Sequence, residues 1–195
     1  VIYMKQYGIT VDYEAYNTAL DKYLESAGKL KATDYERIGL VKACLGYDRN
    51  FIIDTINNKT GTGGIMSTIY GLMLAVSNDY VSPDRITEIA DSLVSLQMAD
   101  GGWNLSGAYS DADVTAMALQ ALSAVRSYGY EDNIQKGVGR LASLQKDDAG
   151  YASYGVNNSE STAQVLMALC ALNIDYRTDT RFIKNGHTVL DALMG

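Results

Sequence analysis

Two segments of the chain carry a single apolar stripe on an otherwise polar helix. In residues 84–97 and 131–145, apolar side chains recur at steps of three and four, which is the spacing of one helix face. This pattern predicts two helices that pack one face inward and show the other to water. The stripe residues are Ile86, Ile89, Leu93 and Leu96 in the first segment, and Ile134, Val138, Leu141 and Leu144 in the second.

Each striped segment is followed by one that is apolar on nearly every side. Residues 112–125 and 161–172 are rich in alanine and leucine, so we expect helices that other helices surround. We therefore expect an all-α chain of about nine helices, inner alternating with outer, in one domain over residues 1–195. Weaker patterns predict the remaining helices at 12–26, 34–46, 49–57, 65–77 and, in the tail, 178–193.

The alternation is also an internal repeat. The run ALQAL at 118–122 matches ALCAL at 168–172 at an offset of 50 residues, whereas the loops before them match at an offset of 48. Periods of this length are typical of stacked helical hairpins. The loop matches are Gln97 with Gln145, Gly102 with Gly150, and Trp103 with Tyr151.

Composition narrows the range of functions. A chain of 195 residues, 47% of them hydrophobic, can fill a core. A formal charge of −7 argues against a surface that neutralises nucleic-acid phosphates. No apolar run is long enough to span a membrane, and the first residues lack the apolar stretch of a secretory signal. Cys44 and Cys170 lie in apolar runs without CxxC spacing, so we expect buried thiols rather than a disulfide or zinc site.

The loop motif resembles that of a known superfamily. Gln97, Gly101 and Trp103 follow the order QxxxGxW, which is similar to the repeats of the terpenoid cyclase and protein prenyltransferase superfamily. In the second copy Gln145 remains, but Ala149 and Tyr151 replace the glycine and the tryptophan. The resemblance covers about residues 84–173. It implies an α/α toroid of alternating inner and outer helices.

Elementary chemistry gives these motif residues a structural role. A glutamine at a helix end can bond backbone groups of the next turn, and a large aromatic ring can cover it. Gly101 and Gly102 allow the positive φ angles of a tight reversal. We therefore interpret these motif residues as ones that hold the repeats together: Gln97, Gly101, Trp103, Gln145, Gly150 and Tyr151.

In toroids of this superfamily the inner helices begin at one rim of a central cavity, so the resemblance implies a binding site there. Such an acidic and aromatic rim favours cationic, polyhydroxyl or apolar ligands over phosphates. The predicted rim residues are Asp34, Glu36, Arg37, Tyr109, Asp111, Asp113, Tyr151, Tyr154 and Glu160.

One segment carries an enzymatic signal. SDADVTA at 110–116 is similar to the DxDDTA proton-donor motif of class II terpene cyclases, with Asp111 and Asp113 in the first and third places. Val114 replaces the last aspartate. Such chemistry also needs a dry, aromatic-lined cavity, and the chain has two Phe and one Trp.

A structural interpretation of the same carboxylates is favoured. Three predicted helix starts carry a cap residue followed three positions later by a carboxylate, which is a capping-box pattern. The pairs are Ser110 with Asp113, Thr33 with Glu36, and Asn157 with Glu160.

Metal and phosphate chemistry receive little support. The prenyltransferases of the superfamily hold zinc with Asp, Cys and His, but the single histidine, His187, falls on the predicted tail helix as a surface residue. Neither cysteine stands in a matching motif, so we expect no metal and no cofactor. GTGG at 61–64 lacks the P-loop and Rossmann frames and is interpreted as a turn.

The sequence therefore favours a non-catalytic binding or interaction module over an enzyme. The resemblance implies a module of a secreted or cell-surface protein, or a cobalamin-carrier-like domain; the enzymatic alternative is an isoprenoid cyclase with Asp113 as general acid. The partner would be a small molecule, a glycan or a protein. Acidic charge and glycosylation acceptors at Asn58, Asn104 and Asn157 favour an extracellular location. About nine helices would leave the ring incomplete, which predicts a homodimer or a further C-terminal segment that closes it.

Overall fold

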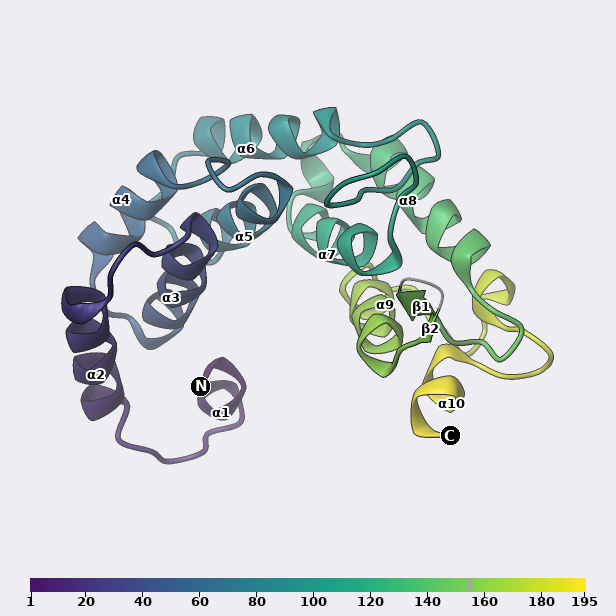
Figure 1. Ribbon diagram of the computed structural model, residues 1–195, viewed down its shortest axis with the longest axis horizontal. Helices are drawn as coiled ribbons and strands as arrows, with labels where there is room; N and C mark the ends of the chain where they lie inside the picture. Colours follow the sequence, from purple (N-terminus) through teal and green to yellow (C-terminus); the bar gives the residue numbers. More distant parts are fainter. Residues whose placement is uncertain (154–155) are drawn as a thin grey trace. The chain divides into compact units, whose positions relative to one another are not determined.

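The structure, a computed structural model, describes residues 1–153 and 156–195 and is all-α (Figure 1). The only strands among these residues form a two-stranded antiparallel hairpin, β1 (Ala152–Ser153) with β2 (Val156–Asn157). None of the helices described combines the length and apolar character that crossing a bilayer requires. The α-helices are α1 (Ile2–Gln6), α2 (Tyr13–Ser26), α3 (Ala32–Leu45), α4 (Arg49–Asn58), α5 (Ile65–Val76), α6 (Pro83–Ser95), α7 (Ala112–Ser123), α8 (Glu131–Leu144), α9 (Ser159–Ala171) and α10 (Val189–Met194).

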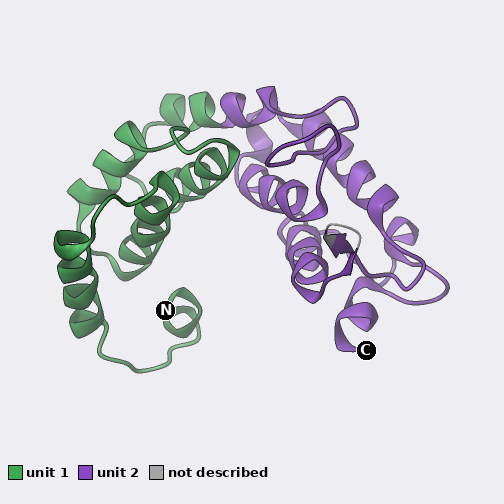
Figure 2. Ribbon diagram, viewed as in Figure 1, with its two compact units in different colours: residues 1–89 green, residues 90–195 purple. Residues whose placement is uncertain are grey.

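The helices fall into two compact units, Val1–Ile89 and Ala90–Gly195, with the boundary inside α6 (Figure 2). In unit 1, α3 packs against α5 and α4, and α1 and α2 lie against α3. The core of this unit comes mainly from α4 and α5, where Ile52, Ile56, Ile69 and Leu72 are buried.

A buried lysine joins three helices of unit 1. The side chain of Lys42, on α3, is fully buried, and its ammonium group lies 2.6 Å from Asp21 of α2 and 3.4 Å from Asp48, the N-cap of α4. The Nζ atom also donates to Asn17 Oδ1 at 3.1 Å and lies 5.4 Å from the centre of the Phe51 ring. Because a buried ammonium group needs charged and polar partners, these contacts fix α2 and α4 against α3.

In unit 2, α7 packs against both α8 and α9, and α9 packs against α10. The predicted inner helix 112–125 is α7, and most of its residues are buried on several faces. The stripe predicted for 131–145 is buried at Ile134, Val138 and Leu141 on α8. Inner and outer character therefore follows the hydrophobic pattern for these two helices.

Four details of the prediction were wrong. Leu96 lies beyond the end of α6 and is 47% exposed rather than buried in the stripe. The helix α9 is not covered on every side, because Met167 is 55% exposed. Cys170 on the same helix is exposed and Cys44 is half-buried. The tail is not one helix: a 3₁₀ turn, Thr180–Phe182, and a bridge between Lys184 and His187 precede the short α10.

Candidate functional site

The two glutamines of the repeat motif make the same pair of contacts. Gln97 Nε2 donates to the carbonyl of Gly101 at 2.7 Å and to the carbonyl of Asn133, on α8, at 2.9 Å. Gln145 Nε2 donates to the carbonyls of Ala149 at 2.9 Å and Phe182 at 3.0 Å. Each amide thus closes its own loop and ties it to the next element of the chain, which is a structural role.

The aromatic residues of the motif are fully buried, and their backbones are held by matching threonines. The amide of Trp103 donates to Thr115 Oγ1 at 2.9 Å, and that of Tyr151 donates to Thr162 Oγ1 at 3.1 Å. The Trp103 indole nitrogen also donates to the carbonyl of Leu93 at 2.9 Å. The Tyr151 hydroxyl has no partner among the described residues, and burial raises its pKa.

These contacts correct the register of the repeat. Thr115 and Thr162 each accept a hydrogen bond from the backbone amide of the motif aromatic. The helices that begin near them therefore match at an offset of 47 residues rather than 50. Thr68 lies 47 residues earlier still, and its hydroxyl donates to the carbonyl of Gly64 as that of Thr162 donates to Asn158. A shared Thr near each inner-helix start was the sequence signal that the comparison of ALQAL with ALCAL missed.

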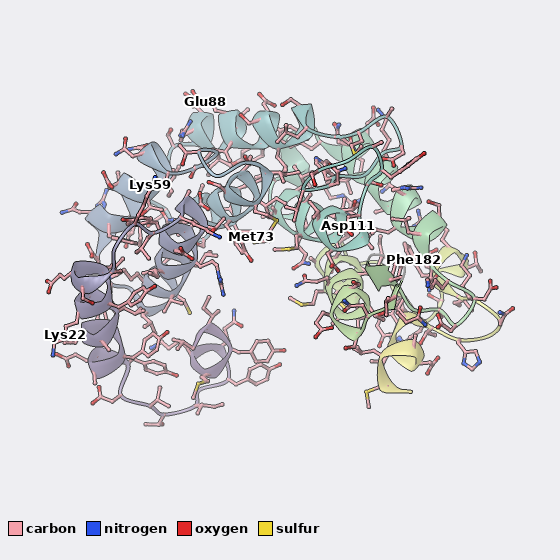
Figure 3. All side chains as sticks on the ribbon, viewed as in Figure 1. Lys22, Lys59, Met73, Glu88, Asp111 and Phe182 are labelled. Carbon is pink, nitrogen blue, oxygen red and sulfur yellow. The ribbon has the colours of Figure 1, made fainter. Side chains whose placement is uncertain are left out.

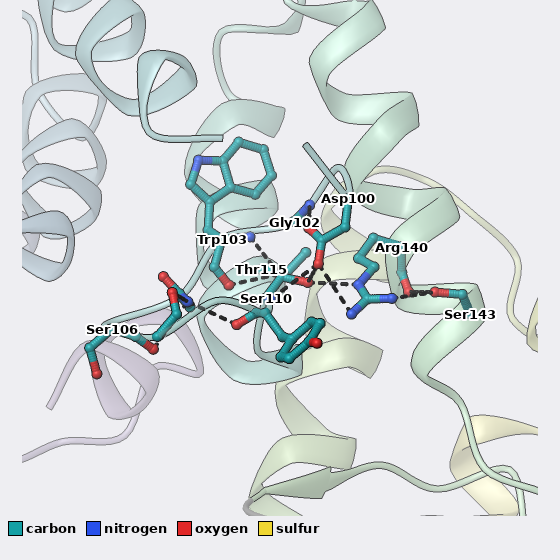
Figure 4. A network of polar contacts seen from close by, with 11 residues as sticks. Asp100, Gly102, Trp103, Ser106, Ser110, Thr115, Arg140 and Ser143 are labelled. Atoms are coloured by element: carbon teal, nitrogen blue, oxygen red, sulfur yellow. Dashed lines mark hydrogen bonds and ion pairs between the residues drawn. The ribbon is translucent and has the colours of Figure 1, made fainter. Parts of the chain in front are cut away.

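A polar network fixes the loop of the first copy (Figure 4). Asp100 Oδ1 accepts from the amide of Gly102, while Asp100 Oδ2 accepts from the amide and the hydroxyl of Ser110 and pairs with Arg140 at 3.2 Å. Burial would raise the pKa of Asp100, but these hydrogen bonds and the guanidinium lower it. Gly101 has a φ of +90°, as expected, whereas Gly102 is required because a Cβ there would lie 2.5 Å from that of Ser110.

The same networks show why two of the three predicted capping pairs were wrong by one residue. Ser110 is bound to Asp100, and its counterpart Asn157 is bound to Asp148, so neither is free to cap. The N-caps are instead Asp111, which accepts from the amides of Asp113 and Val114, and Asn158, which accepts from those of Glu160 and Ser161. The helix α3 differs as well: its N-cap is Lys31, whose amide donates to Asp34 at 2.9 Å.

Asp113 and Glu160 lie in the first turns of the neighbouring helices α7 and α9. Burial raises the pKa of Asp113, the Ser161 hydroxyl lowers it, and the charges of Asp111 and Glu160 raise it further. Asp113 Oδ1 and Ser161 Oγ are buried, and neither makes a hydrogen bond of normal geometry within the described residues. Asp113 is the predicted rim residue that most resembles a proton donor.

The other predicted rim residues are divided between the two units. Asp34, Glu36 and Arg37 belong to unit 1, whereas Tyr109, Asp111, Asp113, Tyr151 and Glu160 belong to unit 2, so their convergence at one rim stays a prediction. Tyr109 is 80% exposed, and Tyr151 is in the core. Tyr154 lies outside the described residues.

Glu36 is not a rim residue, because it is completely buried. Its Oε1 lies 2.5 Å from Ser67 Oγ on α5, and its Oε2 has no partner among the described residues. Burial raises the pKa of Glu36 to about 7, although the Ser67 hydrogen bond lowers it. Ser67 also bonds the carbonyl of Lys59 and accepts from the amide of Gly61, so it fixes the turn that precedes α5.

Unit 2 contains an open cleft of about 880 Å³, here called the C-terminal cleft. Its lining residues include several with carboxylate, amide and hydroxyl side chains. Asp148 accepts there from the amide of Gly150 and from the side chain of Asn157, and Asn185 donates to the carbonyl of Asp147. The lining residues are Asp147, Asp148, Gly150, Tyr151, Asn157, Asn158, Ser159, Thr162, Asn185, His187, Asp191, Ala192 and Gly195.

His187 is exposed, as predicted for a surface residue, but it lies in the bridge with Lys184 rather than on a helix. Within residues 1–153 and 156–195, no three His, Cys, Asp or Glu side chains are placed to hold a metal ion. Sequence reasoning did not predict the C-terminal cleft, because part of its wall comes from the tail, which was expected to be one helix.

Comparisons of the chain with family models, with curated proteins and with solved structures give no significant match.

Proposed function

We propose that the chain is a non-catalytic binding module whose ligand is a polar, polyhydroxyl molecule such as a glycan, bound in the C-terminal cleft. The observation that carries the proposal is the lining of this cleft. Asp147, Asp148, Asn157, Asn185 and Asp191 offer carboxylate and amide groups, which are the side chains suited to pairs of hydroxyl groups. An isoprenoid would instead need an apolar, water-free surface.

The scaffold residues support the same proposal. Gln97, Gln145 and Trp103 make their hydrogen bonds within the fold and do not line the C-terminal cleft. Asp113 does not line the C-terminal cleft. A role in an extracellular protein fits the acidic charge of the chain and remains part of the proposal.

Calorimetric titration with cellotriose, chitotriose and maltotriose tests the proposal. We expect at least one trisaccharide to bind, and we expect Asp147→Ala and His187→Ala each to weaken binding several-fold, because both side chains line the cleft and make no side-chain hydrogen bond described for the fold. Asp132→Ala, an exposed aspartate of α8, is the matched control and should bind as the wild type does. Equal affinities for all variants would contradict a site in the cleft.

Acid catalysis by Asp113 is the second candidate, because its pKa is raised and its Oδ1 lies buried beside Ser161. We expect no turnover of squalene or of a polyprenyl diphosphate by the wild type. Turnover that Asp113→Asn abolishes would favour the enzyme over the binding module.

Stability separates the two aspartates of α7. Asp111→Ala should cost about 1 kcal/mol, because Asp111 caps the helix. At pH 7, Asp113→Asn should leave the free energy of unfolding unchanged or raise it. The raised pKa of Asp113 means that its ionised form destabilises the folded state, and asparagine cannot ionise. Chemical denaturation of both variants measures the difference. A larger loss for Asp113→Asn than for Asp111→Ala would show that the ionised carboxylate stabilises α7.

A further inference from the structure

Three lysines gather around one cleft of unit 1. The cleft has a volume of about 360 Å³ and is lined by Lys29 and Lys31, before α3, and by Lys59, after α4 (Figure 3 labels Lys59). None of the three ammonium groups forms an ion pair within the described residues. Their positive charges are therefore uncompensated at one place, although the chain as a whole carries a formal charge of −7.

Other groups in the cleft suit an anion. Thr33 and Thr62 line it, and the Thr33 hydroxyl makes no hydrogen bond within the described residues, whereas that of Thr62 donates to the carbonyl of Lys59 at 2.7 Å. The Lys59 ammonium lies 4.8 Å from the centre of the Tyr35 ring, which holds it at the wall of the cleft. The nearest carboxylate in the sequence, Asp34, accepts from the Lys31 amide and lines a different groove.

The wall of the cleft is fixed in advance. Gly63 stands so close to α3 and α5 that a Cβ on it would lie 3.2 Å from the Cβ atoms of both Ala32 and Ser67. Ser67 holds the same turn by accepting from the amide of Gly61 at 2.9 Å and by bonding the carbonyl of Lys59 at 3.0 Å. A wall that is already ordered loses little conformational entropy when a ligand binds.

We propose that this lysine cleft is a binding site for a tetrahedral oxyanion, the phosphate or sulfate group of a small ligand. Three ammonium groups and a free hydroxyl supply the charge and the donors that such a group accepts. The site is separate from the C-terminal cleft, since all its residues lie in unit 1. It also differs from the predicted rim, whose acidic and aromatic residues are expected to favour other ligands over phosphates.

The test is an amide chemical-shift titration of the full chain with sodium phosphate and with sodium sulfate, against sodium chloride at matched ionic strength. We expect saturable shifts at Thr33 and Gly63 with both oxyanions and none with chloride. The triple variant Lys29→Gln, Lys31→Gln, Lys59→Gln should bind phosphate at least about tenfold more weakly.

The control carries the same charge change elsewhere: Lys22→Gln, Lys136→Gln, Lys184→Gln, none of which lines the lysine cleft. It should keep the affinity within about twofold of the wild type. Circular dichroism should first show that both triple variants are folded. An equal loss in both triples would show general charge attraction and overturn the proposal, as would the absence of oxyanion-specific shifts at Thr33 and Gly63.

Discussion

Replacing Trp103 by alanine should lower the free energy of unfolding by about 3–5 kcal/mol, the largest effect we expect of any single substitution here. Its side chain is fully buried in unit 2, so truncation removes a large apolar contact and leaves a cavity. The loss of the indole hydrogen bond adds to the cost, because the carbonyl of Leu93 then lacks that donor. Denaturant unfolding followed by circular dichroism measures the change.

Substitutions to phenylalanine separate the packing of the motif aromatics from their hydrogen bonding. Trp103→Phe should cost about 1–3 kcal/mol, because it loses the bond to Leu93 as well as part of the ring. Tyr151→Phe should cost nothing or stabilise the fold, because the hydroxyl is buried without a partner among the described residues. Tyr109→Ala, at an 80% exposed position, is the control for an aromatic truncation. A Trp103→Ala variant as stable as Tyr109→Ala would contradict the scaffold role of the motif.

Glu36 should make the stability of the chain fall as the pH rises from about 4.5 to about 7. Burial raises the pKa of Glu36 in the folded state from 4.5 to about 7. Below pH 4.5 Glu36 is protonated in both the folded and the unfolded chain. Between pH 4.5 and about 7 it loses its proton in the unfolded chain but keeps it in the folded one. Above pH 7 folding has to bury the charged carboxylate. The stabilisation is therefore complete at low pH and is lost as the pH passes through 7, by about 3 kcal/mol.

The hydrogen bonds around Ser67 agree with a protonated Glu36. The Ser67 hydroxyl has one proton but lies within bonding distance of two acceptors, Glu36 Oε1 at 2.5 Å and the carbonyl of Lys59 at 3.0 Å. Both contacts are satisfied only when Glu36 donates to Ser67 and Ser67 donates to Lys59. The raised pKa therefore has a geometric counterpart.

Glu36→Gln isolates this effect, since glutamine is the same size and can still donate to Ser67. Its free energy of unfolding should lack the decline that the wild type shows between pH 4.5 and 8, while the exposed Glu25→Gln should retain it. Identical pH profiles for Glu36→Gln and the wild type would show that the pKa of Glu36 is the same in the folded and the unfolded chain, and would contradict this prediction.

The helices were predictable because the spacing of hydrophobic residues along the sequence indicates which face of a helix is buried. The stripe of α8 and the burial of most of α7 follow from the positions of Ile134, Val138, Leu119 and Leu122. The contacts of Gln97 and Trp103 were predictable in kind, because a helix end needs partners for its backbone groups.

The errors arose where two residues compete for one role. Ser110 and Asp111 can both cap a helix, and only the contact of Ser110 with Asp100 decides between them.

The burial of Lys42 and Glu36 depends on partners far away in the sequence, Asp21 and Ser67, which no local pattern indicates. The C-terminal cleft was missed because the tail, which supplies part of its wall, was expected to be one helix.

The most direct test of a polar-ligand module is to map the amide chemical shifts of the full chain as a trisaccharide is added. The account predicts saturable shifts confined to the C-terminal cleft, at residues such as Asp148, Asn157, Asn185 and Asp191. Shifts centred on Asp113 at the start of α7, or no shifts with cellotriose, chitotriose or maltotriose, would contradict it.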